Sequence, residues 1–192
     1  MKKLCVFCGS RAGKKASYTE TARLLGKRIA QKNHTLVYGG GHVGVMGAVA
    51  EGALSEKGHV IGIIPGHLEK KEQAFLELPE LEIVPHMYVR KNRMKELSDG
   101  FCLLPGGYGS LDEIFELITL RQLKRHNKPI IIVNVDGFWN SLITLINDMF
   151  EYGFIEKEHL ELFTITDSVE DVVPIFEAEL EKIGDTIHFS PE

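Results

Sequence analysis

The chain has 192 residues, 44% of them hydrophobic, and its 22 basic and 27 acidic side chains give a net charge of −5 with neutral histidines. This length suffices for one sizeable core but is short for two, so we expect a single domain over residues 1–192. The negative charge creates no field that would attract nucleic acid or an anionic membrane, and no apolar run approaches a membrane span, so we expect a cytoplasmic protein that binds small molecules.

In the first half of the chain, short apolar runs alternate with helix-period segments, which is typical of βα units around a parallel sheet. We expect strands at residues 4–8, 35–37, 59–64 and 82–84, and helices over 43–57 and 87–97. Ser17 and Glu20 have the spacing of a capping box that would open a further helix. Residues 67–80 are charged and predict a loop or short helix that could move over a site.

The second half of the chain continues the same alternation. It predicts strands at residues 101–104, 130–135 and 163–166, and helices over 110–124, 139–151 and 169–182. The continuous apolar run at 130–135 is typical of a strand covered on both faces. Together the two halves predict a Rossmann-like, three-layer α/β fold with a central parallel sheet flanked by helices.

The cysteines and histidines form no pattern that suggests a metal site. Cys5 and Cys8 alternate on one extended strand, so their side chains point to opposite faces and cannot easily share a metal or a disulfide. We expect them, and Cys102, to be buried reduced thiols. The eight histidines have no metal-ligand spacing and no serine lies in a GxSxG elbow, so we expect neither metal nor acyl-transfer chemistry, and no cofactor.

Two glycine-rich turns each follow a predicted strand and open a predicted helix: GGGHVGVMG, which contains Gly41 and Gly44, and PGGYGSLDE at residues 105–113. Backbone N–H groups and the helix dipole favour an anion there, although glycine also serves simply to make a tight corner. Two such turns at the carboxyl ends of parallel strands would face one crevice. Neither matches GxxxxGKS or a complete GxGxxG fingerprint, so a nucleoside monophosphate is a better ligand than a hydrolysed ATP or a dinucleotide.

Two charged positions near the second turn have alternative interpretations. Ser110 and Glu113 have capping-box spacing, yet a carboxylate in the first turn of a phosphate-binding helix could also polarise water beside the sugar. Arg90, Lys91 and Arg93 form a basic cluster, which is either a solvated helix face or a binding site for a phosphate or a leaving group.

Four segments together, FCGSRAG, YGGGHVGVMG, MYVRKNRM and PGGYGSLDE, resemble the Lonely Guy family of cytokinin riboside 5′-monophosphate phosphoribohydrolases, often mislabelled lysine decarboxylases. The resemblance implies hydrolysis of the N-glycosidic bond of AMP or an N6-substituted AMP by a homodimer. It implies that Arg90 and Glu113 are catalytic. It also implies substrate contacts by residues of the glycine turns and their surroundings, namely Glu72, Lys91, Gly41, Gly44, Gly107, Tyr108, Gly109 and Ser110.

This sequence departs from the family pattern at Ser110, Asp112 and Tyr88, where threonine, glutamate and histidine are usual. Tyr88 changes the polarity of the expected pocket and therefore affects base preference. A decarboxylase would require pyridoxal phosphate on a Schiff-base lysine in a far larger fold. The alternative from another class is a non-catalytic carrier of a nucleotide or phosphorylated cofactor.

The helix after the second turn favours self-association. Its apolar residues form two stripes, one of Leu111, Ile114, Phe115 and Ile118, the other of Leu117 and Leu120. If one stripe covers the sheet, the other needs a partner subunit, unless neighbouring helices of the same chain cover it.

Overall fold

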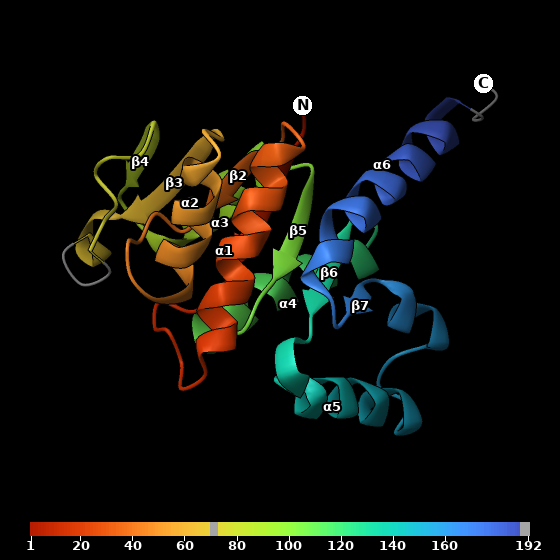
Figure 1. Cartoon of the computed structure of the whole chain (residues 1–192). Helices are drawn as coiled ribbons and strands as arrows, with labels where there is room; N and C mark the ends of the chain where they lie inside the picture. The colour runs from red at the N-terminus through yellow and green to blue at the C-terminus, as the bar shows by residue number, and fades with distance from the viewer. Residues whose placement is uncertain (70–72, 189–192) are drawn as a thin grey trace.

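The structure, a computed structural model, describes residues 1–69 and 73–188 and is built around one sheet of seven parallel strands (Figure 1). The strands are β1 (Lys3–Phe7), β2 (Thr35–Tyr38), β3 (Val60–Pro65), β4 (Glu80–Val84), β5 (Gly100–Leu103), β6 (Ile130–Val133) and β7 (Thr164–Thr166). Their order across the sheet is β4-β3-β2-β1-β5-β6-β7. The chain thus winds outward from β1 in one direction and from β5 in the other, which confirms the predicted Rossmann-like α/β fold.

Helices cover both faces of the sheet. The helices are α1 (Ala16–Gln31), α2 (Gly44–Ser55), α3 (Met87–Leu97), α4 (Tyr108–Gln122), α5 (Asn140–Glu151) and α6 (Val172–His188). Buried residues of α1, α2 and α6 share one core cluster with one face of the sheet, whereas α3 and α4 pack on the other face (Figure 1). Helix α5 lies below the sheet in this view and packs Leu142 and Ile143 against the second cluster. This three-layer arrangement is the predicted one.

Alternation along β1 divides its side chains between the two core clusters. Leu4, Val6 and Cys8 belong to the α1/α2/α6 side, and Cys5 and Phe7 to the other. The predicted separation of Cys5 and Cys8 is therefore confirmed, and burial raises the pKa of the Cys5 thiol well above its usual value.

Neither predicted capping box forms. Helix α1 begins after Lys15 without a side-chain cap, and Ser17 instead donates a hydrogen bond to Asp136 Oδ2 at 2.7 Å. Helix α4 begins at Tyr108, two residues earlier than predicted, because Gly107 is extended and serves as its N-cap. Ser110 is thus already inside the helix and makes no cap bond, so Glu113 is not half of a capping box.

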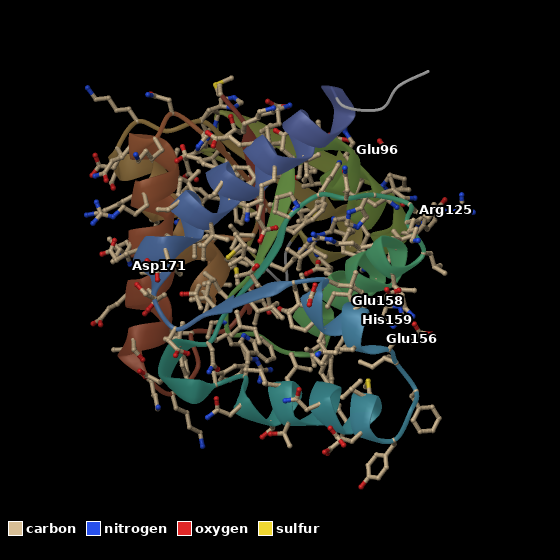
Figure 2. All side chains as sticks on the ribbon, turned by 90° about the vertical axis from the view of Figure 1, so that its right-hand side faces the viewer. Glu96, Arg125, Glu156, Glu158, His159 and Asp171 are labelled. Atoms are coloured by element: carbon tan, nitrogen blue, oxygen red, sulfur yellow. The ribbon has the colours of Figure 1, made fainter. Side chains whose placement is uncertain are left out.

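Short 3-10 helices complete the fold at η1 (Gly66–Leu68), η2 (Val135–Gly137), η3 (Lys157–Glu161) and η4 (Val169–Asp171). A capping box does form at η3, where Glu156 and His159 cap each other's backbone (Figure 2). After η1, Phe75 N–H donates to Gly40 O at 2.9 Å and Ala74 forms an isolated bridge with Gly41, so this segment is fastened to the turn after β2. Among the described residues, no helix is long and apolar enough to cross a membrane.

Candidate active site

A cavity of about 520 Å³ opens at the carboxyl ends of β1 and β5. These two strands are neighbours and mark the point where the strand order reverses, which is where open α/β sheets bind their ligands. The walls of the cavity come from residues 8–13 after β1, residues 105–110 after β5, and side chains of the surrounding segments. Those side chains are Tyr18, Val45, Met46, Met87, Arg90, Asp112, Glu113 and Phe138.

The turn after β5 presents the bare start of helix α4 to this cavity. Gly107, Tyr108, Gly109 and Ser110 all line it, and no side chain caps the helix. A Cβ added at Gly107 or Gly109 would meet no atom within 4 Å. Packing therefore does not require glycine at these two positions, whereas a ligand that approaches the first-turn N–H groups closely would require it.

Arg90 and Glu113 meet at the wall of the cavity. Arg90 Nη2 lies 3.6 Å from Glu113 Oε1, and the two side chains are only 6% and 9% exposed. Arg90 is thus buried and not part of a solvated basic face, while Arg93 pairs at 2.8 Å with Glu82. A buried ion pair is costly to desolvate and is weak evidence for stability, so its position beside a cavity suggests a functional role.

The start of α2, which follows the turn after β2, is not open to an anion as predicted. Gly9 O accepts hydrogen bonds from the N–H groups of Val45 and Met46, at 3.1 and 3.2 Å, so the start of α2 is already capped by backbone. Gly41 and Gly44 are not among the described residues that line the cavity. Gly44, at φ +66°, packs so closely on residues 10–11 that a Cβ would lie 2.6 Å from Arg11 C.

This turn instead leaves space for the site. A Cβ at Gly39 would collide with the guanidinium of Arg90. The glycines after β2 thus allow the 8–13 loop and Arg90 to approach, and of the two glycine turns it is the one after β5 that presents an open helix start to the cavity. The expectation that both glycine turns face one crevice is confirmed only in part: Val45 and Met46 of GGGHVGVMG line the cavity together with the turn after β5, whereas Gly41 and Gly44 do not.

The loop after β1 and an aromatic wall were not predicted as parts of the site. Residues 9–13, among them Arg11, line the cavity together with Tyr18 and Phe138, whose rings meet edge to face at 5.5 Å. Asp136, at φ +51°, holds the turn before Phe138 through Ser17, and that hydrogen bond lowers the pKa of the Asp136 carboxyl. FCGSRAG follows the first strand, and it could have been assigned to the site had the strand order been known.

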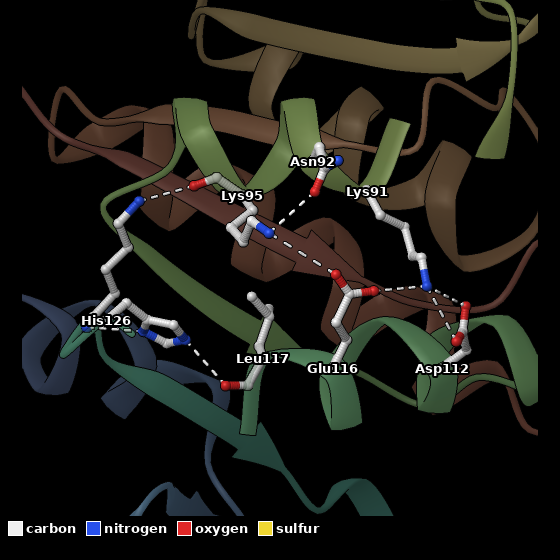
Figure 3. Close-up of polar contacts among 8 residues, drawn as sticks. Lys91, Asn92, Lys95, Asp112, Glu116, Leu117 and His126 are labelled. Atoms are coloured by element: carbon white, nitrogen blue, oxygen red, sulfur yellow. Dashed lines mark hydrogen bonds and ion pairs between the residues drawn. The ribbon is translucent and has the colours of Figure 1, made fainter. Parts of the chain in front are cut away.

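The remaining predicted contacts lie elsewhere. Lys91 is not among the described lining residues; its Nζ reaches Asp112 and Glu116 of α4, as Figure 3 shows. Tyr88 is also outside the lining, 63% exposed, and stacks on His86. Glu72 lies outside the described residues.

Fold and site together define a Rossmann-like α/β protein with a cavity at its topological switch point and a buried Arg–Glu pair in the cavity wall. A family model described as "Possible lysine decarboxylase" matches residues 46–176. Cytokinin riboside 5′-monophosphate phosphoribohydrolase LOG3 of Arabidopsis thaliana is 42% identical over 172 residues, which cover 90% of this chain and 80% of that protein. LOG7 of the same plant is 46% identical over 154 residues, 80% of this chain and 71% of that one. The chain therefore belongs to this family, that of the Lonely Guy phosphoribohydrolases which its motifs resemble.

A similar structure is that of a Moco carrier protein from Chlamydomonas reinhardtii. It has a TM-score of 0.72 at 19% identity, over 94% of this chain and 98% of that one. This likeness concerns the fold alone.

Proposed function

We propose that the chain hydrolyses the N-glycosidic bond of a nucleoside 5′-monophosphate, AMP or an N6-substituted AMP, to the free base and ribose 5-phosphate. The names of the LOG3 and LOG7 relatives support this reaction class. The observation that carries the proposal is that the buried Arg90–Glu113 pair and the uncapped start of α4 line the same cavity.

In the proposed complex, the 5′-phosphate lies at the start of α4, against the backbone of Gly107, Tyr108, Gly109 and Ser110. These N–H groups and the helix dipole stabilise the anion. Glu113 follows Ser110 by three residues on the same helix, so its carboxylate is near the sugar that hangs from this phosphate. The rings of Tyr18 and Phe138 offer apolar surface to the purine.

In the proposed reaction, water adds to C1′ while the bond from C1′ to the base nitrogen breaks and its electron pair leaves with the base. Glu113 accepts the proton of the water and its negative charge stabilises the oxocarbenium-like transition state. The proton that Glu113 has taken from the water then passes to the departing base through solvent, which regenerates the carboxylate and releases base and ribose 5-phosphate as stable products. Arg90 compensates the charge of Glu113 in this poorly solvated place and adds positive potential for the anionic substrate.

A decarboxylase reaction fits the site poorly. Pyridoxal phosphate needs a lysine for its Schiff base, and the described residues that line the cavity include no lysine. The family's descriptive name therefore does not indicate the reaction that this site supports.

The test is an incubation of the purified protein with AMP, N6-substituted AMP and adenosine, with products followed by chromatography. We expect free base and ribose 5-phosphate from the monophosphates, and scarcely any cleavage of adenosine, which lacks the anion that α4 would hold. AMP binding without release of adenine would contradict hydrolysis and favour the carrier alternative. Equal cleavage of adenosine would show that α4 does not hold a phosphate.

We also infer a homodimer and a cytoplasmic location. Helix α4 does not form the two separate apolar stripes that were expected, because Leu117 and Ile114 are both buried in the same core cluster and Leu120 is half-buried. The better support is on α5 and in the turn after it, where Leu145, Tyr152 and Phe154 are 50%, 77% and 82% exposed. The buried thiols of Cys5, Cys8 and Cys102 suit a reducing compartment.

A further inference from the structure

Helices α3 and α4 are joined at two adjacent positions. Arg90 of α3 pairs with Glu113 of α4 inside the wall of the cavity. The next residue of α3, Lys91, extends its Nζ to 3.2 and 3.1 Å from the two carboxylate oxygens of Asp112 and 2.7 Å from Glu116 Oε2 (Figure 3). Asp112 and Glu116 are four residues apart on one face of α4, so this ammonium bridges two carboxylates that would otherwise repel each other.

The two helices are not completely packed beside this bridge. A gap of about 10 Å³, room for about one water molecule, is lined by Phe7, Lys91, Lys95, Glu113, Glu116 and Leu117. Glu113 lines both this gap and the main cavity. A change in the spacing of α3 and α4 at Lys91 would therefore displace the carboxylate of Glu113.

Lys91 is poorly placed to bind substrate. It is not among the described residues that line the main cavity, and its side chain is only 20% exposed. Two carboxylates compensate its charge, and the hydrogen bond with Glu116 raises its pKa, so the ammonium stays charged at neutral pH. A second cation, Lys95, lies 3.9 Å from Glu116 Oε1 and adds to the same bridge.

We propose that Lys91 is a positioning residue, which holds α3 against α4 through Asp112 and Glu116 and so sets the contact between Arg90 and Glu113. This inference rests on the function proposed above for that pair. It replaces the substrate contact that the family resemblance implied for Lys91.

A mutant cycle distinguishes positioning from substrate contact. We expect Lys91→Met and the double variant Asp112→Asn/Glu116→Gln each to lower kcat for AMP by roughly 10- to 100-fold, with KM little changed, because the reacting groups are displaced. The triple variant, which combines all three substitutions, should lose no more kcat than the double variant, because each of these variants removes the same bridge between α3 and α4. Lys91→Arg, which keeps the charge, should recover most of kcat.

A substrate contact gives the opposite pattern. Lys91→Met would then raise KM, and the carboxylate variants would leave KM unchanged or lower it, because the freed lysine would still attract the phosphate. Either that pattern or additive losses in the triple variant would overturn the proposal. Arg93→Met is the matched control, because Arg93 is on the same helix but pairs with Glu82, and its kcat should equal that of the parent.

A spectroscopic measurement keeps this test separate from the proposed reaction. The side-chain N–H resonance of Arg90, observed by NMR in ¹⁵N-labelled protein, reports the position of its guanidinium without any turnover. We expect it to shift in Lys91→Met and to return in Lys91→Arg, with thermal unfolding confirming that each variant is folded. An unshifted Arg90 resonance in Lys91→Met would overturn the positioning role, even if the parent did not hydrolyse AMP.

Discussion

The proposed chemistry depends most on Glu113, whose carboxylate would activate the water. Its side chain is 9% exposed and pairs with Arg90 instead of capping α4. Glu113→Gln keeps the shape of the side chain but removes its charge, so we expect AMP turnover to fall by about 10²–10⁴-fold, the usual loss for a general base. The measurement is the rate of adenine release beside calorimetric AMP binding.

Arg90→Lys complements this variant, because it keeps a positive charge but loses the planar fork of the guanidinium. Thermal unfolding of both variants controls for the loss of a buried ion pair, since removal of one partner leaves the other uncompensated. A folded Glu113→Gln protein that binds AMP and releases adenine at the parent rate would remove Glu113 from the mechanism.

Gly109 offers a second prediction, in which stability and binding change in opposite directions. It lies in the first turn of α4, where a Cβ would meet no protein atom within 4 Å. Gly109→Ala should raise the free energy of unfolding by about 0.5–1 kcal/mol, because alanine is the better helix former. The methyl group would crowd a phosphate at the helix start, so we expect AMP affinity to fall about tenfold or more, which corresponds to roughly 1.4 kcal/mol.

Urea unfolding and calorimetry measure these two effects. Gly106→Ala is the contrasting variant, because its Cβ would collide with Ser110 and should destabilise the fold itself. Unchanged AMP affinity in a stabilised Gly109→Ala protein would mean that the phosphate is held elsewhere.

The C-terminal half of helix α4 is fastened by His126. Its Nε2 lies 3.0 Å from Leu117 O and its Nδ1 accepts the Lys128 N–H at 3.2 Å, so these partners assign the neutral Nε2–H tautomer. Burial lowers the pKa of His126 below its ordinary value of 6.5, with Arg121, Lys128 and Lys95 adding repulsion. In the unfolded chain His126 takes up a proton near pH 6.5, whereas in the folded chain it does so only at lower pH. The contribution of His126 to the free energy of unfolding therefore decreases as the pH falls below 6.5.

We expect His126→Gln to show a smaller decrease in the free energy of unfolding between about pH 7 and 5 than the parent. Urea unfolding at a series of pH values measures the difference. The exposed His67 is the matched control, and His67→Gln should keep the parent's pH dependence. A parallel pH dependence in parent and His126→Gln would mean that His126 does not contribute to acid sensitivity.

Exposed apolar side chains bear on the assembly of the protein. Leu145 presents apolar surface in the middle of α5, and Tyr152 and Phe154 do so in the turn after it. We expect a dimer by light scattering at micromolar concentration. A triple substitution of these residues by serine should shift the mass toward the monomer, if this surface is the interface.

The parent protein and a variant with serine at Leu123, another exposed apolar residue, are the controls. A monomeric parent would contradict the homodimer. A parent dimer that survives the triple substitution would place the interface on another surface.

Much of the fold was predictable because the signals for it are local. The period of apolar residues identified every strand to within two residues, and the run of short β-branched segments indicated a parallel sheet. The main helices were also identified, although the last one ends at His188 and not near residue 182. The exact helix starts were less predictable, since Gly107 and Lys15 cap α4 and α1 without the side-chain bonds that Ser110 and Ser17 suggested. Those serines had the right spacing, but the tertiary structure gave Ser17 a partner on another element, Asp136.

The βα architecture, the glycine turn at the start of α4 and the candidate pair of Arg90 and Glu113 could be predicted from the amino-acid sequence. Each depends on residues a few positions apart or on a recognisable motif. Which loops meet could be known only from the fold, because the order of strands depends on which face each crossover helix covers. That order placed β1 beside β5, brought the 8–13 loop into the cavity, left Gly41 and Gly44 to support it, and turned Lys91 toward α4.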